Sequence, residues 1–519
     1  MKLYAYTLGF HSETGAAMHL ALAENGSPIA LNDGFGVLFP KADFALDAWE
    51  GQSRGLINPW VFRCNGGGFG VLALRRLLPG EGRAACEPKE SHCALLFQSE
   101  DLLHYRELGL VAIAPEGNPL EDIRCAWDGE TYRMQALYGG VWHAFRSDDL
   151  ARFAEEGQPE PIAPRETIAV WDANPACALT VTEEEARRLR MRLCKPEYPK
   201  GARVSPFPLM PARGDPMALR YGDGYLFMAT DDEHGQLALK IRKVRHINEI
   251  ATADDHTLFT AASEGDMSGS LWAPELHWVG DRLCIYFAAG KPHWYTVQCH
   301  VMWLTGDDPT SAACWSAPRR MEKADGSPLC DDGITLDMTV IPTRKGDYVI
   351  WSQRPIRTDP LRCGTADLMI ARLDHAHPWR LETEPVTLSR PEFGWERINS
   401  PVNEGPFLLR HGDALYVTYA AALIDHTYCV GMLIARDGDD LTDPSVWQKN
   451  NYPVVHRYSM PGRIGAGHNS FVKDEDGADV LLIHAIPLQN YLHDPHDLRR
   501  YPCIGAVEWD EDHFPHLLG

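Results

Sequence analysis

The chain has 519 residues, more than the roughly 250–300 residues that one hydrophobic core usually serves, so we expect two domains. Its formal net charge of −23 repels phosphate backbones and anionic lipid surfaces, which argues against nucleic-acid and membrane partners. Hydrophobic residues make up 45% of the chain, as in a globular protein with a packed core rather than a disordered one.

The N-terminus and the cysteines bear on the cellular compartment. Residues 1–15 soon become polar and lack the uninterrupted apolar stretch of a signal peptide, and no later segment is apolar enough to span a bilayer. The 13 cysteines are odd in number and form no Cys-x-x-Cys pair, which favours buried thiols in a reducing compartment over disulfides or a zinc site. We therefore predict a cytoplasmic protein.

Residues 1–160 contain short β-branched and aromatic runs separated by Gly and Asp turns, and we predict a β-rich, blade-like domain there. Residues 161–204 are rich in Pro and Glu. They include a capping-box pattern, Thr182-Glu-Glu-Glu185, that opens a helix-like stretch. We predict that 161–204 is a linker with a short helix and that 205–519 is the second domain.

Four turns in the second domain predict β-hairpins. Gly and Asp tolerate the positive φ angles of tight hairpin loops, and each of these turns is followed by an apolar β-branched or aromatic run. The turns lie at residues 221–225, 279–282, 344–348 and 410–414.

An acidic or polar residue precedes each hairpin in regular order. These residues are Asp215, Glu275, Asp337, Glu404 and His468, at intervals of 60, 62, 67 and 64 residues (275 − 215, 337 − 275, 404 − 337 and 468 − 404). This period suits a four-stranded propeller blade. We predict an all-β fold in which 205–519 form a five-bladed β-propeller, so that equivalent residues of different blades meet near its axis.

Glycoside hydrolysis needs one carboxylic acid to protonate the leaving oxygen and one carboxylate to activate water or attack carbon. Asp215, Asp337 and Glu404 are the best candidates, because each begins a blade and is flanked by Pro, Gly or apolar residues. The alternative is that these acids cap turns or pair with arginines at strand ends. That alternative does not explain why the three acids occupy equivalent positions in their blades.

At residues 205–500 the sequence resembles glycoside hydrolase family 43, in particular its α-L-arabinofuranosidase-like members. Five ordered motifs carry the resemblance: Gly214-Asp-Pro216, Trp272-Ala-Pro-Glu275, Thr335-Leu-Asp-Met-Thr339 with Trp351-Ser-Gln-Arg354, Asn403-Glu-Gly-Pro406, and Gly465-Ala-Gly-His-Asn469.

The resemblance implies an inverting reaction in which Asp215 is the general base and Glu404 the general acid. Asp337 would then orient Glu404 and raise its pKa by like-charge repulsion. Inversion predicts a separation of roughly 6.5–9.5 Å between the carboxyl groups of Asp215 and Glu404, which leaves room for a water molecule.

The same resemblance implies substrate-binding roles for Trp272, Glu275, Arg354 and His468, with one of Arg499 and Arg500 as an alternative arginine. His468 on the axis would face a bound Ca²⁺ or other cation, directly or through water, or would be a hydrogen-bonded core histidine. We expect no cofactor to be required.

We predict an exo-acting enzyme that releases terminal arabinofuranose from oligosaccharides. Two other glycosidase activities are alternatives: β-D-xylosidase and β-D-galactofuranosidase. Two non-catalytic alternatives are a carbohydrate-binding propeller and a scaffold for protein partners. In the first half, Ile57-Asn-Pro59 stands where a catalytic blade would show Asp-Pro. An amide cannot act as a general base, so we expect this half to bind carbohydrate, close the pocket or mediate homo-oligomer formation.

Overall fold

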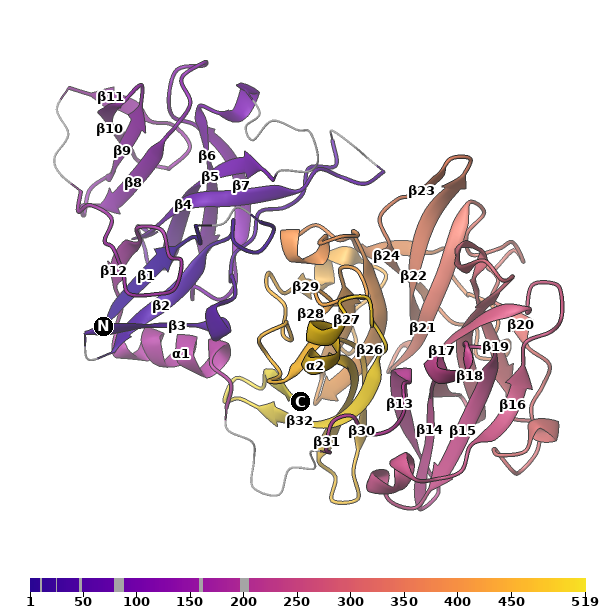
Figure 1. Ribbon diagram of the computed structural model, residues 1–519. Helices are drawn as coiled ribbons and strands as arrows, with labels where there is room; N and C mark the ends of the chain where they lie inside the picture. The colour runs from indigo at the N-terminus through magenta and orange to yellow at the C-terminus, as the bar shows by residue number, and fades with distance from the viewer. Residues whose placement is uncertain (10–11, 25, 46–48, 79–87, 158–161, 197–204) are drawn as a thin grey trace. The chain divides into compact units, whose positions relative to one another are not determined.

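The computed structural model describes residues 1–9, 12–24, 26–45, 49–78, 88–157, 162–196 and 205–519 (Figure 1). Over these ranges the protein is all-β with short helices. The chain divides into two compact units, Met1–Pro196 with Glu392–Trp395, and Glu197–Pro391 with Glu396–Gly519. No helix within the described ranges has both the length and the apolarity to cross a membrane.

The described residues of the first unit form three four-stranded antiparallel sheets. In the order of their hydrogen-bonded neighbours, the sheets are β12 (Cys177–Thr180), β1 (Lys2–Tyr6), β2 (His19–Glu24) and β3 (Ser27–Ala30); β4 (Arg54–Arg63), β5 (Phe69–Leu77), β6 (Cys93–Ser99) and β7 (Arg106–Ala112); and β8 (Asp122–Trp127), β9 (Tyr132–Tyr138), β10 (Val141–Ser147) and β11 (Ala154–Glu156).

The first unit continues past residue 160, where we expected it to end. β12 pairs with β1, so residues 177–180 complete the first sheet. The predicted helix is confirmed as α1 (Glu183–Leu193), and the Thr182 side chain accepts a hydrogen bond from the Glu185 backbone amide while the Glu185 side chain accepts one from Thr182. Of the expected linker, residues 161 and 197–204 lie outside the described residues.

Over residues 205–519 the second unit forms five sheets in which successive strands are neighbours. In chain order the sheets are β13 (Gly214–Tyr221), β14 (Gly224–Thr230), β15 (Ala238–Val244) and β16 (His256–Thr260); β17 (Gly269–Val279), β18 (Arg282–Gly290), β19 (Gln298–Trp303) and β20 (Arg319–Arg320); β21 (Gly333–Thr343), β22 (Gly346–Thr358), β24 (Asp367–Arg372) and β25 (Val386–Ser389), with β23 (Leu361–Cys363) beside β22; β26 (Asn403–His411), β27 (Ala414–Ala421), β28 (Cys429–Arg436) and β29 (Gln448–Lys449); and β30 (Arg463–Lys473), β31 (Asp479–Pro487), β32 (Tyr501–Trp509) and β33 (Pro515–Leu518). The four predicted hairpins are confirmed as the β13–β14, β17–β18, β21–β22 and β26–β27 turns.

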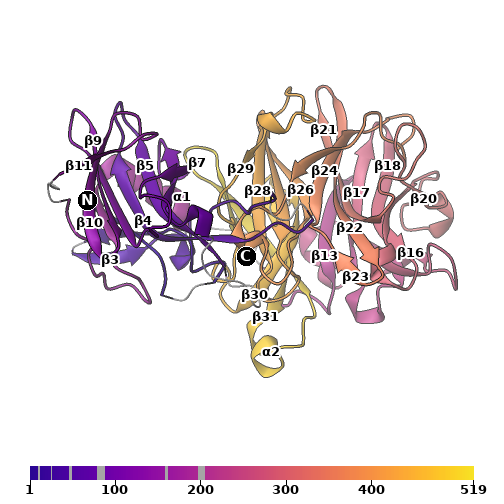
Figure 2. The same ribbon diagram turned by 90° about the horizontal axis from the view of Figure 1, so that it is seen from above.

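The first strands of the five sheets contact one another in a closed order. β13 contacts β17, β17 contacts β21, β21 contacts β26, β26 contacts β30, and β30 contacts β13. In Figure 1 these strands lie towards the inside of the unit, whereas β16 and β20 lie at its edge. The helix α2 (Leu488–His493) projects beyond β31 (Figure 2).

The fifth sheet contacts the first sheet, and this contact completes the ring of sheet-to-sheet contacts. The Ser470 hydroxyl donates to the Pro216 carbonyl over 2.8 Å, and the Leu209 amide donates to the Pro502 carbonyl over 3.0 Å. Buried apolar side chains of both sheets form one cluster at this seam, among them Ala218, Phe227, Val472, Leu482 and Ile504. Burial of these side chains supplies most of the free energy that holds the two sheets together.

The first strand of each sheet in this unit carries a β-bulge at the position of the predicted site residue. The pairing register shifts at these points, and a residue there has a positive φ: 55° at Asp215, 43° at Ala273, 56° at Asp337, 54° at Gly405 and 43° at His468. A bulge bends the strand and re-aims a side chain, which is why bulges gather beside active sites.

We predict that Leu482→Ala lowers the free energy of unfolding by about 2–5 kcal/mol, because the leucine is only 1% exposed at the seam and its loss leaves a cavity. Urea denaturation followed by tryptophan fluorescence measures the change. The control is Leu237→Ala, since Leu237 is 46% exposed. An equal effect of both substitutions would contradict this account of the seam.

Candidate active site

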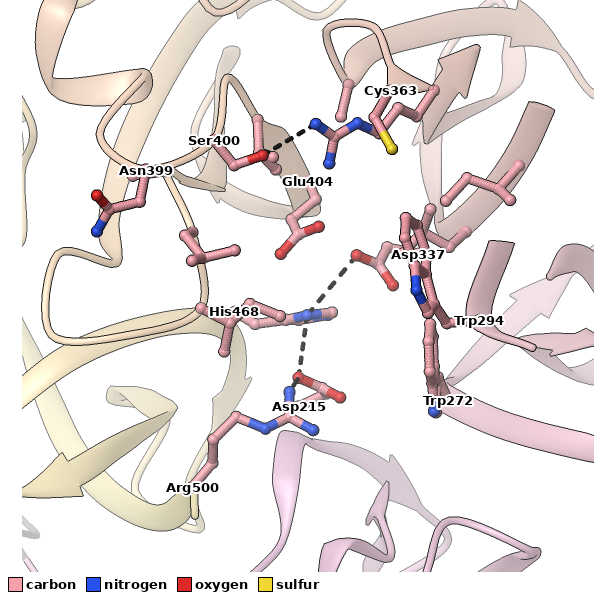
Figure 3. Close-up of a pocket in the computed structure, with 18 of the residues that line it drawn as sticks. Asp215, Trp272, Trp294, Asp337, Cys363, Asn399, Ser400, Glu404, His468 and Arg500 are labelled. Carbon is pink, nitrogen blue, oxygen red and sulfur yellow. Dashed lines mark hydrogen bonds and ion pairs between the residues drawn. The ribbon is translucent and has the colours of Figure 1, made fainter. Parts of the chain in front are cut away.

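A cavity of about 480 Å³ opens where the five bulges meet, a volume suited to a small ligand. Each of the five sheets contributes at least one lining residue from its first strand, among them Asp215, Trp272, Asp337, Glu404 and His468. Figure 3 shows the three carboxyl groups turned towards one another around the His468 ring. The structure therefore brings together acids that lie up to 189 residues apart in the sequence (404 − 215).

Asp215 is buried among positively charged and polar partners. Its Oδ1 lies 2.7 Å from an Arg500 guanidinium nitrogen and 3.1 Å from His468 Nδ1, and the Thr230 hydroxyl donates to its Oδ2 over 2.6 Å. Burial alone would raise the pKa of Asp215, but the charges of Arg500 and His468 outweigh it and hold the pKa well below 3.8. Asp215 is thus a carboxylate at neutral pH.

His484 fixes the backbone at Asp215. The Asp215 amide donates to His484 Nδ1 over 3.1 Å, so the imidazole accepts at Nδ1 and carries its proton on Nε2. Burial lowers the pKa of His484 to about 4, which keeps the ring neutral. The ring also stacks on Tyr428, with centroids 5.7 Å apart and planes at 4°.

Arg500 is held in place from two sides. Besides Asp215, its guanidinium group binds the Asp232 carboxylate through contacts of 2.7 and 2.9 Å. A Cβ on Gly214 would lie 2.2 Å from Arg500 Cζ, so only glycine at position 214 leaves room for the arginine. The Gly-Asp dipeptide of the sequence motif therefore supplies both the carboxylate and the space for its counter-charge.

Glu404 and Asp337 have the opposite electrostatic character from Asp215. The Tyr428 hydroxyl donates to Glu404 Oε1 over 2.7 Å, and the Gly405 amide donates to Asp337 Oδ2 over 3.1 Å. Burial raises the pKa of both acids, that of Asp337 to about 7. For Glu404 the first cause is burial, with the charge of Asp215 adding to it, and repulsion between Glu404 and Asp337 contributes to the raised pKa of Asp337.

His468 lies between two of the carboxyl groups. Its Nδ1 is 3.1 Å from Asp215 Oδ1 and 3.8 Å from Asp337 Oδ2. Burial alone would lower the pKa of His468, but these two carboxyl groups raise it to about 10. Within the described residues, no three or more His, Cys, Asp or Glu side chains are grouped so that they could hold a metal ion, and the cation beside His468 stays a prediction.

The other predicted binding residues divide into two groups. Trp272 and Arg354 line the cavity, where Trp272 Nε1 donates to Gln236 and Arg354 donates to the Ser400 hydroxyl over 2.9 Å. Glu275 does not line the cavity. It is buried beside it, with its Oε2 2.7 Å from His277 Nε2.

Sequence reasoning did not identify the residues that orient the three acids. Thr230 lies at the end of β14 and carries no motif. Tyr428 and His484 belong to conspicuous segments, but nothing in the sequence reveals that they hold Glu404 and the backbone of Asp215. Arg499 and Arg500 were equivalent candidates, and the structure pairs Arg499 with Asp497 on the surface instead.

Comparison with known proteins places this second unit in a family. The sequence model described as "Glycosyl hydrolases family 43" matches residues 207–515. An extracellular exo-α-(1→5)-L-arabinofuranosidase of Streptomyces avermitilis is 31% identical over 314 residues, which are 60% of this chain and 62% of the relative. This chain therefore spans less than two thirds of that relative.

Two further proteins are similar over most of their own length. The extracellular exo-α-(1→5)-L-arabinofuranosidase of Streptomyces chartreusis is 33% identical over 291 residues, 56% of this chain and 84% of the relative. The crystal structure of an α-L-arabinofuranosidase from Lactobacillus brevis is 31% identical with a TM-score of 0.53, and the match covers 60% of this chain and 95% of that chain.

The prediction of a cytoplasmic protein is contradicted by these comparisons, because both Streptomyces relatives are named extracellular enzymes. The prediction depended on the early polar residues of the N-terminus and on the pattern of the cysteines. Several of them, including Cys284, Cys299, Cys429 and Cys503, are buried in the structure. A buried thiol packs as a small apolar side chain and therefore does not report the redox state of the compartment.

We predict opposite protonation states for the two buried histidines. The raised pKa keeps His468 charged at pH 8.5, whereas the lowered pKa keeps His484 neutral at pH 5.5. Since folding raises the pKa of His468 from 6.5 to about 10, its charge stabilises the folded state below pH 6.5, and this contribution is lost as the pH rises through about 10.

Imidazole ¹⁵N chemical shifts of histidine-labelled protein measure both states, and the His468→Gln and His484→Gln variants assign the signals. Titration of both rings near pH 6.5 would contradict the electrostatic description of the site.

Proposed function

Because this chain belongs to glycosyl hydrolase family 43, we propose that it is an exo-acting, inverting glycosidase that releases terminal arabinofuranose from oligosaccharides. The observation that carries the proposal is one sugar-sized cavity with an ionised carboxylate, Asp215, and a carboxyl group of raised pKa, Glu404. The choice of arabinofuranose is supported by the names of the relatives in Streptomyces and Lactobacillus.

We also propose that the five sheets of the second unit are the blades of a five-bladed β-propeller. The closed order of contacts among β13, β17, β21, β26 and β30 supports it. In such an arrangement the first strands surround the axis, and residues at their bulges face one pocket.

In the proposed reaction Asp215 accepts a proton from a water molecule as the water oxygen attacks the anomeric carbon. Glu404 donates its proton to the glycosidic oxygen as that bond breaks, so the leaving group departs as a neutral alcohol. The carbon is attacked on the face opposite the leaving group and its configuration inverts. Asp215 ends protonated and Glu404 ionised, and exchange with solvent restores both groups.

Asp337 and His468 would act on the two reacting carboxyl groups. We propose that Asp337 contacts the sugar and restrains the Glu404 segment through the Gly405 amide. His468, as an imidazolium, would supply positive charge beside Asp215 and Asp337.

We propose that the first unit is non-catalytic. Asn58 occupies a bulge of β4 with φ 50°, the counterpart of Asp215 in β13, and Pro59 follows it as Pro216 follows Asp215. The Asn58 amide group donates to the Glu121 carbonyl over 2.8 Å, which supports a structural role.

We predict that Asp215→Asn lowers kcat/KM by at least about 100-fold on both 4-nitrophenyl α-L-arabinofuranoside and α-1,5-arabinobiose, because both reactions need the base. Glu404→Gln should reduce the rate far more on arabinobiose, since nitrophenolate leaves without a proton and a sugar alkoxide does not. Steady-state kinetics on the two substrates measure this difference.

The control is Asp223→Asn in the exposed β13–β14 turn, which should retain wild-type rates. Proton NMR of the first product should show the β-anomer. Wild-type protein that hydrolyses neither arabinofuranoside would overturn the proposed function, and retention of configuration would overturn the roles of Asp215 and Glu404.

We predict that Arg500→Met moves the acidic limb of the pH profile of kcat/KM to higher pH by about one pH unit or more. An adjacent opposite charge lowers a carboxyl pKa by about that amount. Removing the guanidinium raises the pKa of Asp215, so the base becomes protonated at a higher pH. Arg500→Lys retains the charge and should shift the limb less.

The matched control is Arg499→Met, whose side chain is 63% exposed and paired with Asp497. If Arg500→Met reduced the rate without moving the limb, Arg500 would have only a structural role.

A further inference from the structure

Tyr428 contacts the proposed acid, Glu404, from the wall of the cavity. Its hydroxyl lies 2.7 Å from Glu404 Oε1, but the tyrosine is fully buried and does not line the cavity. Glu404 does line the cavity. One carboxyl oxygen of Glu404 therefore faces the tyrosine, and the other, Oε2, is available to a ligand.

The Tyr428 proton determines which oxygen of Glu404 carries the acidic proton. Within the residues that the structure describes, Glu404 is the only hydrogen-bond partner of the Tyr428 hydroxyl. If Oε1 were protonated and donated to the tyrosine, the buried Tyr428 proton would have no acceptor, which is energetically unfavourable. If Tyr428 donates instead, Oε1 is the carbonyl oxygen of the acid and the acidic proton lies on Oε2.

The Tyr428 ring is fixed by close packing. It stacks on the His484 imidazole, with centroids 5.7 Å apart and planes at 4°. A Cβ on Gly467 would lie 2.3 Å from Tyr428 Cδ1, so the ring occupies the space that any larger residue at position 467 would need. This packing keeps the hydroxyl directed at Glu404.

Given the proposed glycosidase function, we propose that Tyr428 is a positioning residue that places the transferable proton of Glu404 on Oε2, facing the glycosidic oxygen of the substrate. As the glycosidic bond breaks, the Oε2–H bond breaks too. The proton moves to the leaving oxygen, and the electron pair of the O–H bond stays on Glu404.

The contact stabilises the transition state more than the ground state. Before proton transfer, Tyr428 donates to a neutral acid, and during the transfer it donates to an oxygen that becomes negatively charged. A hydrogen bond to an ionised acceptor is stronger than one to a neutral acceptor. Only interactions that strengthen in this way accelerate the chemical step. Tyr428 should therefore matter most for leaving groups that need a proton.

The same contact influences the ionisation of Glu404 in the free enzyme. Burial raises the pKa of Glu404, and the Tyr428 hydrogen bond acts in the opposite direction because it stabilises the carboxylate. The other charged or titratable groups that face Glu404 come from four strands: Asp215, Asp337, Arg354 and His468. A substitution at Tyr428 leaves these four groups in place.

We predict that Tyr428→Phe lowers kcat/KM on α-1,5-arabinobiose about tenfold, and by at least about fivefold more than on 4-nitrophenyl α-L-arabinofuranoside, whose nitrophenolate leaves without a proton. The basic limb of the pH profile on arabinobiose should move to higher pH by about one unit, because a carboxyl group that loses a donor ionises at higher pH. Steady-state kinetics on both substrates across the pH range of activity measure both effects.

The matched control is Tyr419→Phe. Tyr419 is also fully buried, and its hydroxyl donates over 2.9 Å to a buried glutamate, Glu396, that does not line the cavity. This variant loses the same kind of bond, so it should affect both substrates equally and leave the basic limb in place. With Tyr428→Phe, equal losses on the two substrates or a basic limb that does not move to higher pH would overturn the proposal.

Failure of the proposed hydrolysis would be distinguishable from failure of this role. If wild type cleaved neither substrate, the carboxyl ¹³C chemical shift of Glu404 in glutamate-labelled protein would still report its pKa, with Glu404→Gln to assign the signal. A higher Glu404 pKa in Tyr428→Phe than in wild type and Tyr419→Phe would support the role of the tyrosine. An unchanged or lower pKa would overturn it.

Discussion

The second unit depends on neutralising one buried negative charge. Asp215 lies at the seam between the first and last sheets, and the groups that stabilise its charge, His468 and Arg500, come from the last sheet and the loop before β32. His484 of β31 holds its backbone. An unpaired buried carboxylate is strongly unfavourable, so the folded state requires the two sheets to meet. The proposed base therefore exists in its active form only when the ring of sheets is closed.

In every sheet of the second unit, a β-bulge in the first strand lies at the cavity. A bulge in the first strand places one residue at positive φ, and a strand without it would direct successive side chains alternately to its two faces. Non-glycine residues at positive φ are energetically unfavourable, and the packing of the sheets imposes this conformation on Asp215, Asp337 and His468. Because the bulges lie in first strands, they meet at one cavity instead of being distributed over the surface.

Two acids of nearly the same intrinsic chemistry acquire pKa values that are shifted in opposite directions by their surroundings. Asp215 is close to a guanidinium and an imidazolium, whereas Glu404 is buried with a tyrosine hydroxyl and lies near other carboxyl groups. Burial disfavours ionisation of both, and only Asp215 has enough positive charge beside it to reverse the effect. This difference is what an acid and a base on opposite sides of one bond require.

The sequence by itself determined the β-hairpins, the helix at 183–193 and the identity of the candidate acids, because turns, caps and strands depend on neighbouring residues. The regular intervals also indicated that Asp215, Asp337 and Glu404 occupy equivalent positions. Only the tertiary structure showed that Arg500 and not Arg499 reaches Asp215, that Glu275 lies outside the cavity, and that burial is the main cause of the raised Glu404 pKa. These facts depend on contacts between residues as many as 285 positions apart, and local sequence patterns carry no information about such distances.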